Sequence, residues 1–215
     1  MAIVKNKIII VGCGPGSPDY LTPAARAAVA DAEALIGATR LLALFPDGGA
    51  ERIAVGKDTE IILEEVARRW NRLRIVVLVT GDPGLYSLAS LIVRRFGRDA
   101  CMIVPGVSAV QTAFARIGLC WQDARIISAH AAVPELNGEE LAACDKIAIL
   151  GGDKELARRL SPIINIMEPR GCRIFACEDL TLPEERISEI AADSLTGRVF
   201  SIRTVILIVR KELLA

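Results

Sequence analysis

The stretch of residues 73–96 constrains the fold of this chain more than any other. It opens with an apolar run, residues 73–79, rich in isoleucine and valine and short enough to be a buried strand. A glycine-proline loop follows, and the spacing of apolar residues after it predicts a helix over 85–96. In open α/β sheets, ligands bind at loops that follow the carboxyl ends of strands. We therefore expect a ligand-binding loop here; a Pro-Gly turn that only links two elements is the alternative.

The residues of this loop favour a role in binding. Gly81 and Gly84 allow the backbone to come close to a ligand, and Pro83 fixes φ and withholds a hydrogen-bond donor. Asp82 lies between them, and a simple turn does not require glycine on one side of an aspartate and Pro-Gly on the other. Asp82 is therefore a candidate site residue.

Alternating strands and helices predict an α/β fold with mostly parallel or mixed sheets. Strands are expected in the first half at 8–11, 33–36, 73–79 and 101–104, and in the second half at 125–128, 146–150, 173–177 and 205–209. Helices are expected at 23–31, 38–45, 59–73, 85–96, 135–144 and 154–164, and a further one opens at the loop 105–110 and runs through Arg116. Residues 187–195 are amphipathic. The pattern breaks at 117–121, so we expect two α/β domains, residues 1–117 and 118–215.

Two further loops that contain glycine follow predicted strands. The loop after residue 11 resembles a dinucleotide-binding loop only poorly, because Ser17 replaces the third glycine and Pro15 and Pro18 remove backbone donors. The loop at 105–110 places small residues at the start of a helix, which suits close packing against a flat ligand. A helix that needs only a serine cap explains the second loop equally well.

Composition excludes several function classes. The 26 lysine and arginine residues balance 26 aspartate and glutamate residues, which gives no electrostatic footprint for nucleic acid. The six cysteines form no CxxC pair, so free thiols are expected instead of disulfides or a metal site. No apolar run approaches 18 residues and no signal peptide is evident, so we expect a cytoplasmic protein without a membrane partner.

The loops, taken in order, resemble those of the tetrapyrrole methylases. The matching motifs are Val11-Gly12-Cys13-Gly14-Pro15-Gly16, Gly81-Asp82-Pro83, Pro105-Gly106-Val107-Ser108-Ala109 and Leu150-Gly151. That family transfers methyl groups from S-adenosylmethionine to uroporphyrinogen- and corrin-type macrocycles. Residues 81–87, 105–111, 118–124 and 178–186 look most like the members that methylate C5 of a corrin precursor in cobalamin synthesis.

The resemblance implies a cofactor held between two α/β domains, a homodimer, and a separate partner enzyme that methylates C15 and decarboxylates the substrate. It assigns S-adenosylmethionine to these positions: Pro15, Thr80, Gly81, Asp82, Leu85, Ser108, Ala109, Leu150, Leu180 and Thr181. Many relatives carry Met and Gly where this chain has Leu150 and Leu180. Relatives of the C5 type often carry His-Gly-Arg where this chain has His130-Ala131-Ala132. The missing arginine would be a partner for a substrate carboxylate.

The chemistry implied by the resemblance needs few catalytic side chains. A sulfonium is a good leaving group, so the protein's main task is to align the methyl group with the attacking carbon. Asp82 then positions the cofactor, and His130 or water takes the proton that the substrate loses; a structurally bonded or solvated His130 is the alternative. Candidates for binding substrate carboxylates are Arg26, Arg40, Lys57 and Arg116, for which surface solvation is the alternative. Other functions left open are methylation elsewhere on a macrocycle, of RNA or of protein, and macrocycle binding without turnover.

Overall fold

The computed structural model describes residues 7–129, 137–152, 155–195 and 197–214. The chain divides into two compact units, Met1–Ser108 and Ala109–Ala215. The sequence placed the boundary between residues 117 and 118, just after the helix α5 (Ala109–Arg116). The structure divides the chain just before this helix. This helix contacts β10 (Thr204–Arg210) in the second unit, and its buried residues, such as Phe114, are why it belongs there.

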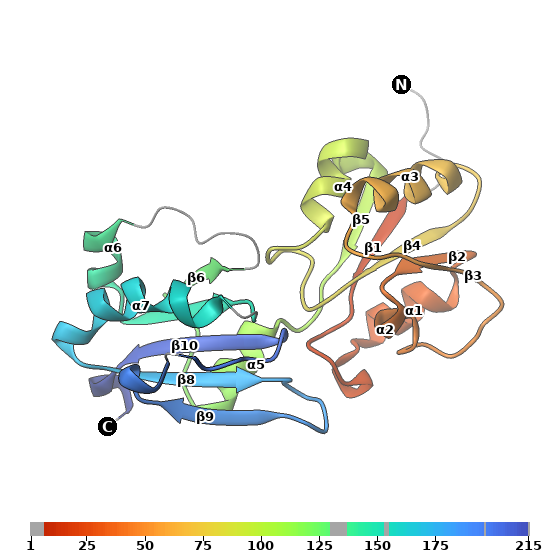
Figure 1. The fold of residues 1–215 in the computed structure, drawn as a ribbon. Coiled ribbons are helices and arrows are strands. Elements are labelled where there is room, and N and C mark those ends of the chain that lie inside the picture. The colour runs from red at the N-terminus through yellow and green to blue at the C-terminus, as the bar shows by residue number, and fades with distance from the viewer. Residues whose placement is uncertain (1–6, 130–136, 153–154, 196, 215) are drawn as a thin grey trace. The chain divides into compact units, whose positions relative to one another are not determined.

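The first unit is built on a five-stranded parallel sheet in the order β3-β2-β4-β1-β5 (Figure 1). Its strands are β1 (Ile8–Gly12), β2 (Ala34–Gly37), β3 (Glu51–Ala54), β4 (Ile75–Val79) and β5 (Cys101–Val104). β1 lies between β4 and β5, and Val11 is in register with Leu78 on one side and Val104 on the other. The buried isoleucine and valine runs form the central strands because both faces of a parallel sheet are covered.

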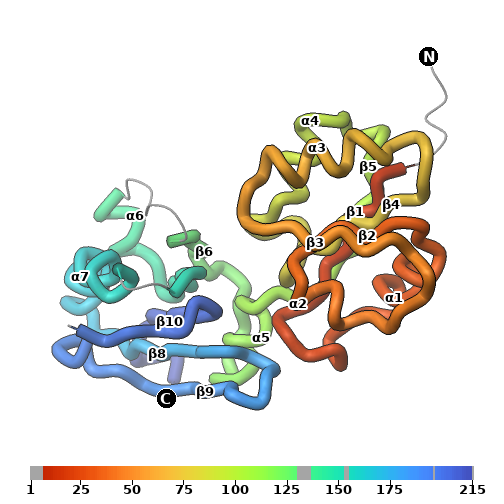
Figure 2. Tube along the Cα trace, turned by 45° about the vertical axis from the view of Figure 1, so that its right-hand side comes forward, coloured from red at the N-terminus to blue at the C-terminus, as the bar shows by residue number. Residues whose placement is uncertain are grey.

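Helices cover both faces of this sheet (Figures 1 and 2). They are α1 (Pro23–Ala30), α2 (Thr39–Leu42), α3 (Thr59–Arg69) and α4 (Ala89–Phe96). α1 and α2 share a core with Leu35 and Val76, whereas α3 and α4 share a core with Ile36 and Val77. The two pairs therefore lie on opposite faces, since adjacent strand residues point to opposite sides.

The strand order reverses between β1 and β4. From β1 the chain crosses β4 through α1 to reach β2, and from β4 it crosses β1 through α4 to reach β5. These two connections run in opposite directions over opposite faces. The carboxyl ends of β1 and β4 are therefore a topological switch point, the place where open α/β sheets bind ligands.

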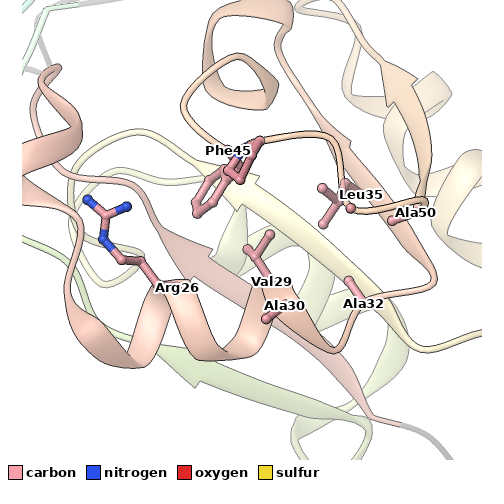
Figure 3. Close-up of a pocket in the computed structure, with 9 residues that line it drawn as sticks. Arg26, Val29, Ala30, Ala32, Leu35, Phe45 and Ala50 are labelled. Atoms are coloured by element: carbon pink, nitrogen blue, oxygen red, sulfur yellow. The ribbon is translucent and has the colours of Figure 1, made fainter.

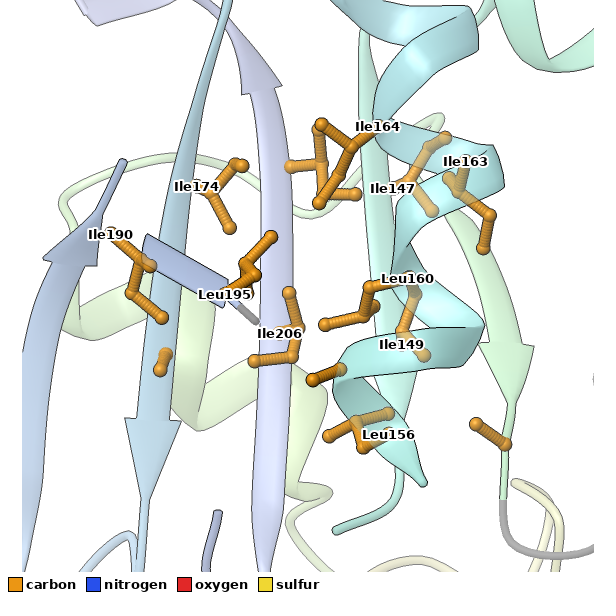
Figure 4. Packing of buried hydrophobic residues seen from close by; sticks show 14 of the residues in the cluster. Ile147, Ile149, Leu156, Leu160, Ile163, Ile164, Ile174, Ile190, Leu195 and Ile206 are labelled. Carbon is orange, nitrogen blue, oxygen red and sulfur yellow. The ribbon is translucent and has the colours of Figure 1, made fainter. Parts of the chain in front are cut away.

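The second unit has a mixed sheet in the order β6-β7-β10-β8-β9. Its other strands are β6 (Arg125–Ser128), β7 (Lys146–Leu150), β8 (Cys172–Glu178) and β9 (Arg186–Ile190). β6 and β7 are parallel, whereas β10 is antiparallel to both of its neighbours. Two more helices, α6 (Gly138–Ala143) and α7 (Leu156–Met167), share a core with the sheet, and Figure 4 shows α7 leucines and isoleucines facing Ile147, Ile149 and Ile206.

Short 3₁₀ helices complete the described structure, at Pro18–Tyr20, Arg98–Ala100, Glu168–Arg170, Ala192–Leu195 and Lys211–Leu214. Within the described residues, no helix combines the length and the apolar composition that crossing a membrane requires.

The α/β class with one parallel and one mixed sheet is confirmed, but several elements differ from expectation. β3 was not predicted, and the segment 187–195, identified only as amphipathic, contributes to β9 and a 3₁₀ helix. The helix expected from residue 85 begins at Ala89, because Tyr86 has φ 46°, outside the helical region. The expected helix 135–144 is seen as α6, while residues 135 and 136 lie outside the described residues.

Candidate functional site

Three loops leave the carboxyl ends of neighbouring strands in the first unit. The first loop, residues 13–17, follows β1; the central loop, residues 80–88, follows β4; and the third loop, residues 105–108, follows β5. β1 lies between β4 and β5, so the three loops emerge side by side at the switch point.

The first and central loops are joined by backbone hydrogen bonds. The Gly81 amide donates to the Gly14 carbonyl at 2.8 Å, and the Gly14 amide donates to the Gly81 carbonyl at 3.3 Å. The Cys13 amide also donates to the Val79 carbonyl at 2.9 Å. Both backbone polar groups of Gly81 are therefore bonded within the protein, which fixes the backbone of the central loop at this point.

Glycines let the loops touch without side chains between them. A Cβ added to Gly12 would lie 2.6 Å from the Gly81 carbonyl oxygen, and one added to Gly106 would lie 2.4 Å from the same atom. Real Cβ atoms do not approach an oxygen so closely, so either methyl group would force the loops apart. Gly81 itself has φ 65°, which favours glycine.

Asp82 connects the central loop to the third loop. Its Oδ1 accepts a hydrogen bond from the Gly84 amide at 2.7 Å, and its Oδ2 accepts one from the Gly106 amide at 3.0 Å. The residue is half-buried. Sequence reasoning identified Asp82 but not its bond to Gly106, which lies 24 residues further along the chain.

The remainder of the central loop presents polar and apolar groups at the same edge. The Arg40 guanidinium, from α2, donates to the Thr80 hydroxyl, and Thr80 is exposed. Leu85 is half-buried, and its amide donates to the Asp82 carbonyl at 3.2 Å. Tyr86 is 58% exposed. The edge therefore offers a hydroxyl, a cation, an aliphatic side chain and an aromatic ring.

Cys13 in the first loop is not an activated thiol. Burial raises the pKa of Cys13 to about 12, against the smaller lowering effects of the Arg40 charge and a backbone hydrogen bond. A thiol that stays protonated is a poor nucleophile, so the geometry gives no support for covalent catalysis through Cys13.

The second unit gathers its predicted residues at one edge of its own sheet. Leu150 ends β7, in register with Ser128 of β6 and Val205 of β10, and Leu180 follows β8. Leu180 lies between two residues in the left-handed region, Asp179 at φ 48° and Thr181 at φ 68°. Strain of this kind persists only where surrounding contacts impose it, and it is frequent at functional sites.

Glu185 holds this strained loop. Its carboxylate accepts hydrogen bonds from the Thr181 amide and from the Arg116 guanidinium. The hydrogen bond from Arg116 is the main cause that lowers the pKa of Glu185, with a further lowering from the Thr181 amide. Sequence reasoning missed this role, and only the acidic composition of residues 184–185 hinted at it.

The predicted residues fall into two groups. The first unit brings Pro15, Thr80, Gly81, Asp82, Leu85 and Ser108 to the three loops, whereas Ala109, Leu150, Leu180 and Thr181 belong to the second unit. His130 lies outside the described residues.

A separate pocket of about 330 Å³ lies in the first unit (Figure 3). Val29 of α1, Leu35 of β2 and Phe45 line it, with Arg26 at its side, and none of its lining residues belongs to the three loops. The Arg26 guanidinium donates to the Pro18 carbonyl at 2.6 Å. Among the described residues, no group of three or more histidine, cysteine, aspartate or glutamate residues is arranged to hold a metal ion.

A known protein family matches most of this chain. The model of the Tetrapyrrole (Corrin/Porphyrin) Methylases matches residues 7–195. The cobalt-precorrin-7 C(5)-methyltransferase of Salmonella typhimurium is 36% identical, over 84% of this chain and 88% of the relative. The probable cobalt-precorrin-7 C(5)-methyltransferase of Methanocaldococcus jannaschii is 31% identical, over 92% of this chain and 95% of the relative.

A longer relative matches through part of its length. The precorrin-6Y C(5,15)-methyltransferase [decarboxylating] of Mycobacterium tuberculosis is 28% identical over 83% of this chain but only 45% of its own length.

Solved structures share the fold. The cobalamin biosynthesis precorrin-6Y methylase of Archaeoglobus fulgidus has a TM-score of 0.72 and 26% identity, covering 95% of this chain and 98% of its own. A uroporphyrin-III C-methyl transferase from Thermus thermophilus, complexed with S-adenyl homocysteine, has a TM-score of 0.74 and 18% identity, covering 94% and 92%.

Proposed function

The chain belongs to the tetrapyrrole (corrin/porphyrin) methylase family, and on this basis we propose that it is a C-methyltransferase that acts at C5 of a precorrin-7-type corrin precursor in cobalamin biosynthesis. The observation that carries the proposal is the match to two relatives named for this activity, along nearly their whole length. The methyl donor in this proposal is S-adenosylmethionine, which supplies an electrophilic methyl group on a positively charged sulfur.

The cofactor is proposed to bind at the ten residues assigned above, beginning with the exposed Thr80 and the half-buried Leu85 of the central loop. The chemistry of these groups fits such a ligand, because they offer a hydroxyl for its polar end and an apolar surface for its rings. Pro15 and Ser108 come from the adjacent loops. Ala109, Leu150, Leu180 and Thr181 are the proposed contributions of the second unit.

The protein's contribution to the reaction is mainly alignment. Methyl transfer to carbon requires the attacking atom in line with the bond that breaks, and holding two reactants in this geometry removes much of the barrier. Loops joined by backbone hydrogen bonds between Gly14 and Gly81, and packed closely at Gly12 and Gly106, are well suited to hold that geometry. His130 or water is proposed to accept the proton that the substrate loses.

Arg40 is the best-supported of the four candidates for binding a substrate carboxylate. It extends from α2 to the Thr80 hydroxyl, at the edge where the cofactor is proposed to bind. Arg116 is the least suited, because its guanidinium already pairs with Glu185. The substrate is either the cobalt-containing or the cobalt-free precursor, and the methyl-transfer experiment uses both forms.

The proposal extends to assembly and partners. A homodimer and a cytoplasmic location are part of it, as is a separate enzyme that methylates C15 and removes carbon dioxide. The C15 partner is supported by the relative from Mycobacterium tuberculosis, whose name combines both methylations and whose length is about twice the part that this chain matches.

A binding and transfer experiment tests the function. Calorimetric titration with S-adenosylmethionine is followed by incubation with carbon-13-labelled donor and either precorrin-7 or cobalt-precorrin-7, with the labelled carbon located by NMR. We expect one labelled methyl group at C5. Absence of cofactor binding contradicts the proposal, binding without transfer indicates a non-catalytic macrocycle-binding protein, and label at another carbon assigns a different position.

A further inference from the structure

We propose that Asp82 is a positioning residue that sets the distance between the central and third loops, and that it supports cofactor binding through those loops without contacting the cofactor's sulfonium. The inference rests on the proposed function, because it concerns the same cofactor.

The first argument is the use of both carboxylate oxygens. Oδ1 is bonded to the Gly84 amide within the central loop, and Oδ2 is bonded to the Gly106 amide in the third loop. Hydrogen bonds to an ionised acceptor are stronger than those between neutral groups. The two bonds hold the carboxylate facing the backbone of its own unit.

The second argument is the close packing of the two loops. The Gly81 carbonyl oxygen lies so close to Gly106 that a Cβ there would be 2.4 Å away. The Gly81 carbonyl therefore fills the space where a Gly106 side chain would lie, while the bond from Gly106 to Asp82 keeps the loops from separating. Close backbone packing and a hydrogen bond at the same residue, Gly106, together set the spacing of the two loops.

The third argument is what this distance connects. The central loop carries Thr80 and Leu85, and the third loop leads from Gly106 to Ser108. These residues are proposed to contact one ligand, so the spacing of the two loops decides whether both can do so at once. A misplacement of about 1 Å at such a site lowers rates about 100-fold.

The test measures how tightly one variant, Asp82→Asn, binds two ligands. S-adenosylmethionine and S-adenosylhomocysteine differ in the methyl group and in the positive charge on sulfur. In Asp82→Asn, one carboxylate oxygen becomes an NH₂ donor that faces a backbone N–H, so one of the two bonds is lost. We expect the dissociation constants of both ligands to rise by the same factor, about tenfold, as the loss of one hydrogen bond to a charged group implies.

Asp58→Asn is the matched control. Asp58 caps α3, and its Oδ1 accepts from the Glu60 amide at 3.0 Å and the Ile61 amide at 3.4 Å. It lies in the same unit but outside the three loops, and an asparagine Oδ1 can accept the same two bonds. This variant therefore removes a carboxylate charge and should leave stability and both dissociation constants nearly unchanged. Gly106→Ala is a second variant that tests the loop spacing, because it displaces the third loop while Asp82 remains. It should also weaken the binding of both ligands by the same factor.

Three results overturn the inference. Weaker binding of S-adenosylmethionine alone indicates direct contact between Asp82 and the sulfonium. Unchanged binding of both ligands in folded Asp82→Asn shows that the loop distance does not matter. Unchanged hydrogen-exchange rates of the Gly84 and Gly106 amides in this variant show that no bond was lost. If the wild-type protein binds neither ligand, the proposed function fails instead, and the exchange rates still test the link between the loops.

Discussion

The Arg116 guanidinium and the Glu185 carboxylate form a two-point ion pair, with Nε donating to Oε1 at 2.6 Å and Nη2 donating to Oε2 at 3.1 Å. Glu185 also accepts from the Thr181 amide. The pair therefore ties α5 to the strained loop after β8, which carries two of the proposed cofactor residues. Two parallel bonds fix direction as well as distance.

The ion pair predicts how stability depends on pH. The folded-state pKa of Glu185 is lowered from 4.5, mainly by the hydrogen bond from Arg116, so the unfolded chain binds more protons just below pH 4.5. The stabilisation is complete above that pH and is lost as the pH falls through the folded-state pKa. We expect Glu185→Gln to flatten the acid side of the stability curve in urea unfolding, and Glu184→Gln, an exposed neighbour, to keep the wild-type curve. Parallel curves for wild type and Glu185→Gln contradict the pair's role.

A methyl group at Gly12 should destabilise the loops. The added Cβ would meet the Gly81 carbonyl oxygen at 2.6 Å and the Gly106 nitrogen at 2.7 Å. Overpacking of this kind lowers stability by about 1–3 kcal/mol. Gly56→Ala is the control, because a Cβ there has no atom within 4 Å, and it should be neutral or slightly stabilising. Equal melting temperatures for the two variants would show that the loops yield easily.

The cysteines should react with a thiol reagent in a defined order. Cys120 is exposed, whereas Cys13 and Cys177 are buried, and burial raises the pKa of each of the two buried thiols to about 12. Thiolates are the reactive form. With iodoacetamide at pH 8, mass spectrometry should find Cys120 modified first and Cys13 and Cys177 modified only after unfolding. Early labelling of Cys13 would contradict the packing of the first loop.

Arg210 should be among the most sensitive positions of the second unit. Its side chain is fully buried, and its guanidinium donates to the carbonyls of Ala142, Cys144 and Met167, near the carboxyl ends of α6 and α7. Arg210→Met leaves these acceptors unsatisfied, so a loss of about 3 kcal/mol or more is expected. Urea unfolding measures it. Arg173→Met, at a partly exposed pair with Glu189, should lose far less stability than Arg210→Met.

The sequence predicted the parts of the fold that depend on local apolar runs. β1, β4 and β10 were recognisable because their residues are buried on both faces. The edge strands β3 and β9 were not, since their half-exposed residues tolerate charge and interrupt the pattern. Strand order and the position of α5 depend on contacts far apart in sequence, which periodicity does not encode.

The candidate site was predicted to a similar extent. Glycine and proline after a buried strand indicated all three loops, and Asp82 was identified by its unusual neighbours. What the sequence could not indicate is which groups bind one another. The bonds from Gly106 to Asp82 and from Arg116 to Glu185 join residues 24 and 69 positions apart, so they exist only once the sheets have formed.

The central position of β10 has a consequence for protein synthesis. β10 follows every other described strand in sequence, yet it lies in the middle of its sheet and pairs with both β7 and β8. A nascent chain can complete the first sheet early, but until residues 204–210 emerge the second has only two separate strand pairs, each with an unpaired inner edge. Such edges are templates for association between chains. Products that stop before Thr204 should therefore aggregate or be degraded, although all strands of the first sheet are present by residue 104.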